Sequence, residues 1–257
     1  MPRQPRSKSS TGVYHVMVRG VNRQNIFCDD EDRQKYLYIL KNVQATDPYR
    51  ILGYCLMNNH VHLLLQEGDN NIAQVMKRIG VAYVRWFNKK YNRVGHLFQD
   101  RFKSEEVEEE AYLLTVLRYI HQNPIKAKLV ISIDAYQWTS YRAYIGEKTY
   151  PMDLVETELI NDLLGISDKK SFEVFEQYMQ EPNKDDCLEV DEKQPLTDKE
   201  LQKIIESLTN SSSPTSIKHM EKAQRLEILK EIKSLEGVTV RQISRITGLG
   251  RYIIANA

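Results

Sequence analysis

Cysteine is scarce in this chain of 257 residues, which contains only Cys28, Cys55 and Cys187. The three lie far apart in the sequence, so they form no C-x-x-C pair and no disulfide framework. That usage suits a reducing cytosol, and we expect a cytoplasmic protein. Long apolar runs are also missing, and the N-terminus has no apolar signal region. We therefore expect no membrane partner.

The chain also lacks a large net charge, but its value of +1 hides a division. Residues 1–103 carry 17 Lys and Arg against 8 Asp and Glu, whereas residues 104–257 carry 19 against 27. A basic first part favours a polyanionic partner, most simply a nucleic acid. Scattered solvated charges would give the same count, so charge alone does not decide the function.

A pair of histidines stands out in the middle of this basic part. The apolar run Ile51–Leu56 and the stretch Met57–Leu65 are joined by the turn signal Asn58-Asn59, which predicts a β-hairpin. Successive strand residues point to opposite faces, so His60 and His62 share one face. Two imidazoles side by side form half of a metal site. The same pattern also occurs in ordinary core or surface histidines, so a metal site needs a third ligand elsewhere.

The surrounding pattern predicts an α+β fold. Val13–Arg19 reads as a strand, and Asp29 or Asp30 can cap a helix with apolar residues from Tyr36 to Val43. After the hairpin, Asn70 or Asn71 can cap a second helix, and 96–107 reads as an extended segment. This order predicts a ferredoxin-like or RRM-like antiparallel sheet with helices on one face. Many nucleic-acid-binding modules share this fold, which does not by itself choose a function.

The rest of the chain reads as helical. A third helix is predicted from about Glu108, ending near Asn123 because Pro124 disfavours helical geometry before it. We predict three domains: 1–146 containing the sheet, 147–196 as a helical extension with an acidic linker, and 197–257 as a helix-turn-helix-like domain. Thr197 with Glu200, and Thr239 with Gln242, have capping-box spacing. An ordinary three-helix packing module remains the alternative for the last domain.

Tyr119 and Asn123 lie four residues apart in the third predicted helix, on one stripe. Tyrosine attack on a phosphodiester needs a phenol, a cation on the phosphate oxygens and a positive surface that holds the strand. Asn123 could add its side-chain oxygen to His60 and His62 as a third ligand for such a cation. Taken alone, Tyr119 is equally an aromatic residue at the edge of the core.

Four ordered motifs resemble those of the single-tyrosine HUH transposases, in particular the REP-associated tyrosine transposases. They are Tyr14–Gly20, His60–His62, Leu97–Ser104 and Arg118–Pro124, and the resemblance covers about Pro5 to Tyr144. It implies a metal-dependent endonuclease and strand transferase that acts on single-stranded DNA beside hairpins. Tyr119 would be the nucleophile of a 5′-phosphotyrosine intermediate, and His60, His62 and Asn123 would bind Mg²⁺ or Mn²⁺.

Basic residues along the chain are the candidate contacts to single-stranded or hairpin DNA. They are Arg3, Arg6, Lys8, Arg19, Arg85, Arg101, Lys103, Arg118 and Lys126, with Arg241, Arg245 and Arg251 in the last domain. A homodimer is one arrangement that the sequence leaves open. Two other functions also stay open: a sequence-specific DNA-binding regulator whose first domain is catalytically idle, and a ferredoxin-like RNA binder with stacking aromatic residues.

Overall fold

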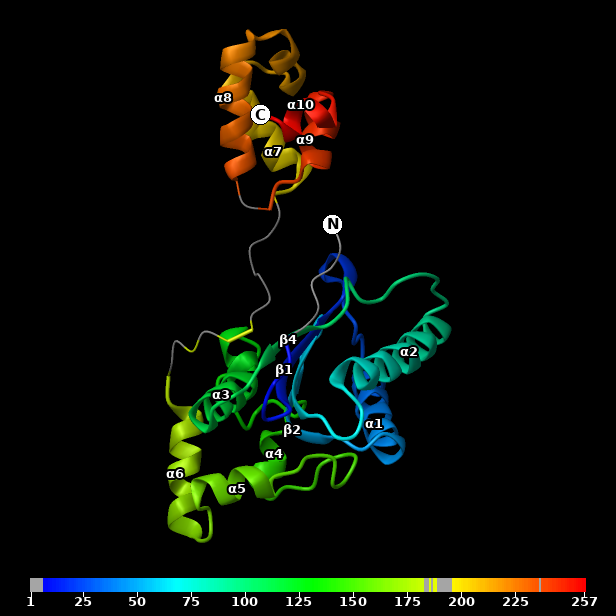
Figure 1. Cartoon of the computed structure of the whole chain (residues 1–257), viewed down its shortest axis with the longest axis vertical. Coiled ribbons are helices and arrows are strands. Elements are labelled where there is room, and N and C mark those ends of the chain that lie inside the picture. Colours follow the sequence, from blue (N-terminus) through cyan, green and yellow to red (C-terminus); the bar gives the residue numbers. More distant parts are fainter. Residues whose placement is uncertain (1–6, 183–184, 186, 189–195, 236) are drawn as a thin grey trace. The chain divides into compact units, whose positions relative to one another are not determined.

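The computed structural model of the chain describes residues 7–182, 185, 187–188, 196–235 and 237–257 (Figure 1). Two compact units make up the chain, Met1–Leu188 and Glu189–Ala257. The first unit contains the sheet, and the described part of the second is helical. Arg3 and Arg6, which we predict to contact DNA, lie outside the described residues.

An antiparallel sheet of four strands organises the first unit, in the order β2-β3-β1-β4. Its strands are β1 (Val13–Arg19), β2 (Arg50–Leu56), β3 (His60–Gln66) and β4 (Lys103–Glu106). Helices α1 (Asp30–Thr46) and α2 (Ile72–Lys90) complete a strand-helix-strand-strand-helix-strand order, and a short 3-10 helix η1 (Val21–Arg23) follows β1. The predicted ferredoxin-like α+β fold is confirmed.

The last strand is shorter than predicted. Of the expected extended segment 96–107, only Lys103–Glu106 is a strand, while Phe98 forms a single bridge to Gly20. Phe98 and Phe102 pack against the core that includes residues of α2, and the Phe98 ring lies 6.4 Å from that of Tyr83. Burial of these aromatic residues competes with strand pairing along this stretch.

Helices α1 and α2 cover one face of the sheet (Figure 1). The Asp29 side chain caps α1 in a full capping box with Asp32, and Asn71 caps α2, as predicted. Their buried stripes, which include Tyr36 and Tyr83, pack on alternate residues of the central strands. This arrangement leaves the opposite face, which carries His60 and His62, to a different helix.

That opposite face is covered by α3 (Glu110–Lys126), so the prediction of helices on one face holds for α1 and α2 only. Leu117 packs where β2 has a bulge next to Gly53. A Cβ atom at Gly53 would lie 2.8 Å from Leu117 Cδ1, so the missing side chain allows the helix its close approach.

The predicted end of this helix at Asn123 is wrong. Pro124 lies inside α3, and the amide of Ala127 donates a hydrogen bond to the Asn123 carbonyl at 2.9 Å. Asn123 and Pro124 are both buried. Tertiary packing therefore outweighs the local preference of the residue before proline for extended geometry.

Three further helices belong to the same unit, namely α4 (Tyr141–Tyr144), α5 (Glu158–Leu164) and α6 (Lys169–Gln180). Ile160, Phe175 and Met179 share one core with α3. The predicted boundary at residue 146 therefore falls inside a compact unit that runs to Leu188. Short apolar stretches in α5 and α6 do not reveal from sequence which surface they bury.

The second unit contains α7 (Asp198–Thr209), the 3-10 helix η2 (Pro214–His219), α8 (Lys222–Ser234), α9 (Val240–Thr247) and α10 (Arg251–Ala255). The box between Thr197 and Glu200 is confirmed. Only half of the second box forms, because the Gln242 side chain donates to the Leu196 carbonyl instead. Gly248, with φ of 68°, provides the turn between α9 and α10.

Within the described part of the chain, we find no helix with the length and hydropathy needed to cross a membrane.

Candidate active site

Two histidines project from β3 toward α3. Arg19 lies opposite His60 and Met17 opposite His62 in the antiparallel pairing of β1 with β3. Because the two histidines alternate with buried Val61, both imidazoles lie on the face that α3 covers, and their ring centroids are 5.1 Å apart.

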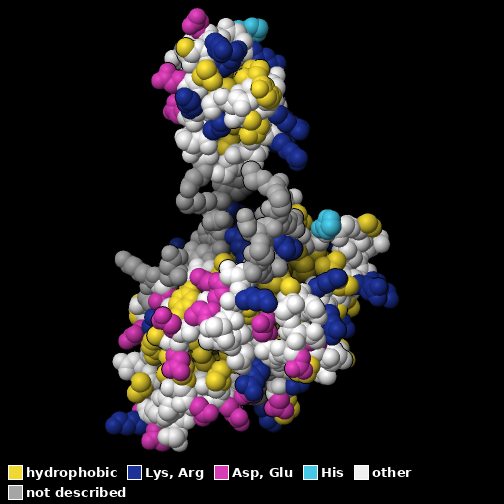
Figure 2. Space-filling view, viewed as in Figure 1, with side chains coloured by type: hydrophobic (Ala, Val, Ile, Leu, Met, Phe, Trp, Pro, Cys, Tyr) yellow, Lys and Arg dark blue, Asp and Glu magenta, His cyan; other side chains and the backbone are white. Residues whose placement is uncertain are grey.

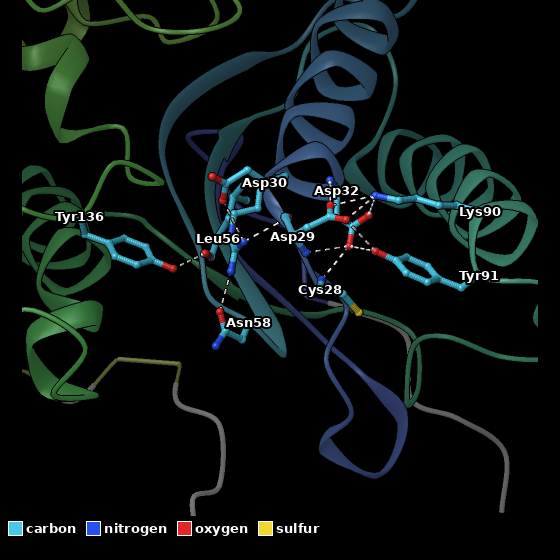
Figure 3. A network of polar contacts seen from close by, with 10 residues as sticks. Cys28, Asp29, Asp30, Asp32, Leu56, Asn58, Lys90, Tyr91 and Tyr136 are labelled. Atoms are coloured by element: carbon cyan, nitrogen blue, oxygen red, sulfur yellow. Dashed lines mark hydrogen bonds and ion pairs between the residues drawn. The ribbon is translucent and has the colours of Figure 1, made fainter.

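The turn that precedes His60 is held by α1 (Figure 3). Arg33 Nη2 donates to Asn58 Oδ1 at 2.6 Å, and its guanidinium lies 5.6 Å from the ring centroids of both Phe27 and Trp138. Asn59 Oδ1 then contacts His60 Nδ1 at 2.7 Å. The hairpin turn thus orients the first imidazole through hydrogen bonds rather than through packing alone.

A second network joins the start of α1 to the end of α2 (Figure 3). The Lys90 ammonium lies 2.8 Å from carboxylate oxygens of both Asp29 and Asp32, and the Tyr91 hydroxyl donates to Asp32 at 2.8 Å. These bonds join α1 to α2 on the face of the sheet opposite the histidines. The network is an anchor of the scaffold, and its carboxylates are already occupied by Lys90.

Helix α3 brings Tyr119 and Asn123 to the same place. The Tyr119 ring centroid lies 5.6 Å from that of His62, with the rings edge to face. Asn123 follows one helical turn later, and its side chain is hydrogen-bonded to His60. Asn123 Nδ2 donates to the Tyr119 carbonyl at 3.1 Å, which leaves the amide oxygen to face His60. The four residues predicted as nucleophile and metal ligands are therefore gathered in one site.

Burial keeps both histidines neutral. Burial, with a smaller contribution from the charge of Arg19, lowers the pKa of His60 to about 4. Burial is also the main reason that the pKa of His62 is well below its ordinary value. Neutral imidazoles have a free lone pair, which is the form that binds metal ions.

The nitrogen lone pairs of the site fit a cation. His62 Nε2 is buried and, in the described structure, has no hydrogen-bond partner. Neutral His60 has one ring proton to share between Asn59 Oδ1, 2.7 Å from Nδ1, and the Asn123 side chain, so one of its two ring nitrogens keeps a lone pair. No set of three His, Cys, Asp or Glu side chains among the described residues could hold a metal ion. A cation here would therefore take Asn123 as its third protein ligand.

The Tyr119 phenol is itself well covered, with 3% of the residue exposed. Lys126 Nζ lies 4.5 Å from its ring centroid and is exposed, which places a cation beside the site. A DNA strand that reaches the phenol must first displace neighbouring groups.

The sequence of this region matches a known family. Residues 8–123 fit the family model described as "Transposase IS200 like". This part of the chain is therefore similar to IS200-like transposases. The match includes His60, His62, Tyr119 and Asn123 and leaves residues 1–7 and 124–257 outside it.

One curated relative is a protein of Haemophilus influenzae described as a REP-associated tyrosine transposase. It is 29% identical over an alignment of 123 positions, which covers 41% of this chain and 66% of the relative. The chain thus spans just under two thirds of that relative's length.

Two solved structures are similar to part of this chain at low identity. A REP-associated tyrosine transposase bound to a REP hairpin is 18% identical with a TM-score of 0.49, and the match covers 61% of this chain and 92% of that chain. A transposase from Deinococcus radiodurans is 19% identical with a TM-score of 0.34, covering 47% and 97% respectively.

Most basic candidates of the first unit lie at its surface. Lys and Arg side chains gather over α2, whereas Asp and Glu side chains are spread over other parts of the same face (Figure 2). The exposed candidates are Lys8, Arg85, Arg101, Lys103 and Lys126. Arg19 is half-buried in β1 beside His60.

Arg118 does not fit its predicted role as a DNA contact. It is 9% exposed, and its guanidinium forms two bonds to the Asp185 carboxylate at 3.0 and 3.1 Å. Its Cζ also lies 4.2 Å from the Tyr178 ring centroid. The residue is therefore engaged in holding α6 and the following segment onto α3.

In the second unit, Arg241, Arg245 and Arg251 are exposed. Arg245 is paired with Asp198 at 2.6 Å, so its charge is partly offset, whereas Arg241 and Arg251 remain candidates for DNA contact.

Two residues of the site have no role in the sequence prediction. His15 Nε2 lies 2.9 Å from His62 Nδ1, and the Glu105 carboxylate lies 3.7 Å from His15 Nδ1. His15 occurs in the predicted first strand, but only the pairing of β1 with β3 and β4 brings it to the histidine pair. That long-range pairing could have been inferred from the ferredoxin-like order, because β1 then lies between β3 and β4.

Proposed function

We propose that the chain is a metal-dependent single-stranded DNA endonuclease and strand transferase that acts beside hairpins, as suggested by the relative bound to a REP hairpin. The observation that carries the proposal is the placement of Tyr119 against His62, whose Nε2 is buried and has no hydrogen-bond partner. A regulator that only binds DNA has no use for a phenol at such a position.

The proposed reaction begins with attack of the Tyr119 oxygen on a phosphorus atom of the strand. The bond from phosphorus to the 3′ oxygen breaks, that oxygen takes up a proton, and the 5′ end stays on the enzyme as a phosphotyrosine. The phenolic proton passes to solvent. Because the new phosphodiester keeps the bond energy, a 3′-OH can reverse the step and join strands without ATP.

His60, His62 and Asn123 would hold Mg²⁺ or Mn²⁺ at this site. A bound divalent cation supplies charge that polarises the phosphate and orients it for in-line attack. Two imidazole ligands favour Mn²⁺ over Mg²⁺, because the harder ion prefers oxygen ligands. The exposed Lys126 and the half-buried Arg19 flank the site and would bind the neighbouring phosphates.

Denaturing electrophoresis with labelled single-stranded hairpin DNA and Mn²⁺ tests the proposal. We expect a protease-sensitive, shifted protein–DNA band that disappears in Tyr119→Phe. Tyr38→Phe is the matched control, because it removes the same atom from an exposed tyrosine of α1. Cleavage by the wild-type protein without a covalent band would contradict the proposal, and a band in Tyr119→Phe would move the role to another tyrosine such as Tyr112.

A second function rests on the burial of Tyr119. With 3% of this residue exposed, the domain could bind DNA without cutting it, as a regulator whose transposase domain is idle. The second unit, with exposed Arg241 and Arg251 next to the α9–α10 turn, would then supply the reading of duplex DNA. Absence of any nicking, together with tight binding of the same hairpin, would favour this function.

A further inference from the structure

A chain of polar contacts runs from the edge of the sheet to the candidate metal ligands. On β4, the Glu105 carboxylate accepts a bond from the Leu188 amide at 3.1 Å and is also bonded to Tyr112. It lies 3.7 Å from His15 Nδ1, and His15 Nε2 lies 2.9 Å from His62 Nδ1. The chain ends at His62 Nε2, which, like His15 Nδ1, is buried and has no hydrogen-bond partner in the described structure.

Strand pairing explains why these groups meet. Glu105 lies directly opposite His15 in the pairing of β4 with β1. On the other side of β1, His62 is opposite Met17, which is two residues from His15 and on the same face. Three neighbouring strands thus each contribute one group to a row, and both histidines of the row are fully buried.

The charge of Glu105 favours one placement of the protons in the row. An ionised carboxylate cannot donate, so His15 must carry its proton on Nδ1, where it faces Glu105. A neutral His15 then has a lone pair on Nε2, which must accept a bond from His62 Nδ1–H. His62, being neutral, is left with its lone pair on Nε2.

The reverse placement fails at both ends of the row. It would turn the lone pair of His15 Nδ1 toward the negative carboxylate, and it would bury a proton on His62 Nε2 with no acceptor in the described structure. The contact of 3.7 Å is longer than an ordinary hydrogen bond, so Glu105 acts on His15 mainly through its charge.

We propose that His15 and Glu105 are positioning residues that hold His62 in the tautomer and orientation in which Nε2 is free to bind a divalent cation. The proposal rests on the proposed function of the site. Neither residue would touch the cation or the DNA. Their role resembles that of the outer carboxylates that orient metal-binding histidines in other proteins, whose loss weakens metal binding by about 10- to 100-fold.

The first test measures Mn²⁺ binding to the full-length protein without DNA, from the free-ion signal in electron paramagnetic resonance. We expect Glu105→Gln to weaken binding about 10- to 100-fold, because a neutral amide no longer selects the proton on His15 Nδ1. His15→Leu should weaken it similarly. Glu106→Gln is the matched control, since it makes the same charge change one residue away, where the strand pairs with Tyr14 instead.

The second test reads the tautomer directly, from ¹⁵N spectra of histidine-labelled, metal-free protein. We expect His62 to be protonated on Nδ1 in the wild type, and this state to be lost or mixed in Glu105→Gln. Such a change would not follow from a purely structural role of Glu105. Because Glu105 is on a sheet edge and partly exposed, Glu105→Gln remains informative even where His15→Leu fails to fold.

The outcomes separate this inference from the proposed function. Wild-type His62 protonated on Nε2, or unchanged Mn²⁺ affinity in both folded variants, would overturn the positioning role and leave the nuclease proposal standing. Failure of the wild-type protein to bind Mn²⁺ even with hairpin DNA would instead overturn the metal site, while the tautomer spectrum would still decide the proton placement.

Discussion

Replacing Gly53 by alanine should displace the helix that carries Tyr119 and Asn123. The new Cβ atom would lie 2.8 Å from Leu117 Cδ1, which is about 0.7 Å closer than the ~3.5 Å at which two carbon atoms rest in contact. Leu117 is fully buried, so the strain passes either to its rotamer or to the seating of α3 on β2.

The expected cost follows from that overlap. Overpacking of this size lowers the free energy of unfolding by about 1–3 kcal/mol. A shift of α3 by several tenths of an ångström would misplace the phenol relative to His62, and displacements near 1 Å reduce reaction rates by up to about 100-fold. We expect the rate of covalent adduct formation to fall about tenfold or more.

Urea unfolding and single-turnover adduct formation measure the two effects. Gly80→Ala is the matched control, because a Cβ there would meet only Phe98 at 3.9 Å and lies within α2. That variant should gain up to about 1 kcal/mol of stability and keep its rate. A further comparison uses Leu117→Ala, which alone should cost about 2–5 kcal/mol and should cost less in the Gly53→Ala background.

The reasoning is refuted if Gly53→Ala matches the wild-type protein in both stability and rate. Additive effects of Gly53→Ala and Leu117→Ala would also refute it, since they would show that the two positions do not share the predicted overlap.

Three further predictions concern other parts of the molecule. Arg33→Lys should lower the free energy of unfolding by about 1.5–3 kcal/mol, measured in urea, because lysine has no guanidinium to bond Asn58 and lie over the Trp138 ring at once. An unchanged urea midpoint would argue against this support of the turn. Arg101→Ala should reduce the slope of log affinity for single-stranded DNA against log salt concentration by about 0.7. Arg118→Ala should change this slope less, because Arg118 is paired with Asp185. Equal changes in slope would contradict the assignment of Arg101, and not Arg118, as a phosphate contact. A chain that ends at Leu188 should still unfold cooperatively and form the covalent adduct. A chain that ends at Tyr150 should do neither, because it exposes the α3 surface that α6 covers. If the chain that ends at Tyr150 is stable and active, α5 and α6 are dispensable.

Local patterns were sufficient for much of the first unit. The alternation in Val13–Arg19, the Asn58-Asn59 turn and the caps at Asp29 and Asn71 are short-range signals, and each of these elements is confirmed. The motif spacing also predicted that the two histidines, Tyr119 and Asn123 would meet, although their chemical roles stay predictions.

Long-range packing accounts for what the sequence did not reveal. Pro124 stays helical because it lies in a buried part of α3, and Arg118 is buried in an ion pair with Asp185. His15 gains a role only through its neighbours on β3 and β4. Each of these outcomes depends on residues more than 40 positions away or on a surface formed by several elements, which no local periodicity encodes.

The four-residue step from Tyr119 to Asn123 also restricts how this gene can change over time. Each residue of a helix turns the chain by about 100°, so one inserted or deleted codon inside the step would swing the amide away from His60 while the phenol stayed in place. Substitutions within the step can be compensated by neighbouring side chains, but a change of length cannot. We expect descendants that keep the proposed activity to differ in the lengths of the loops around 92–102 and 127–140, and never in the length of this one turn.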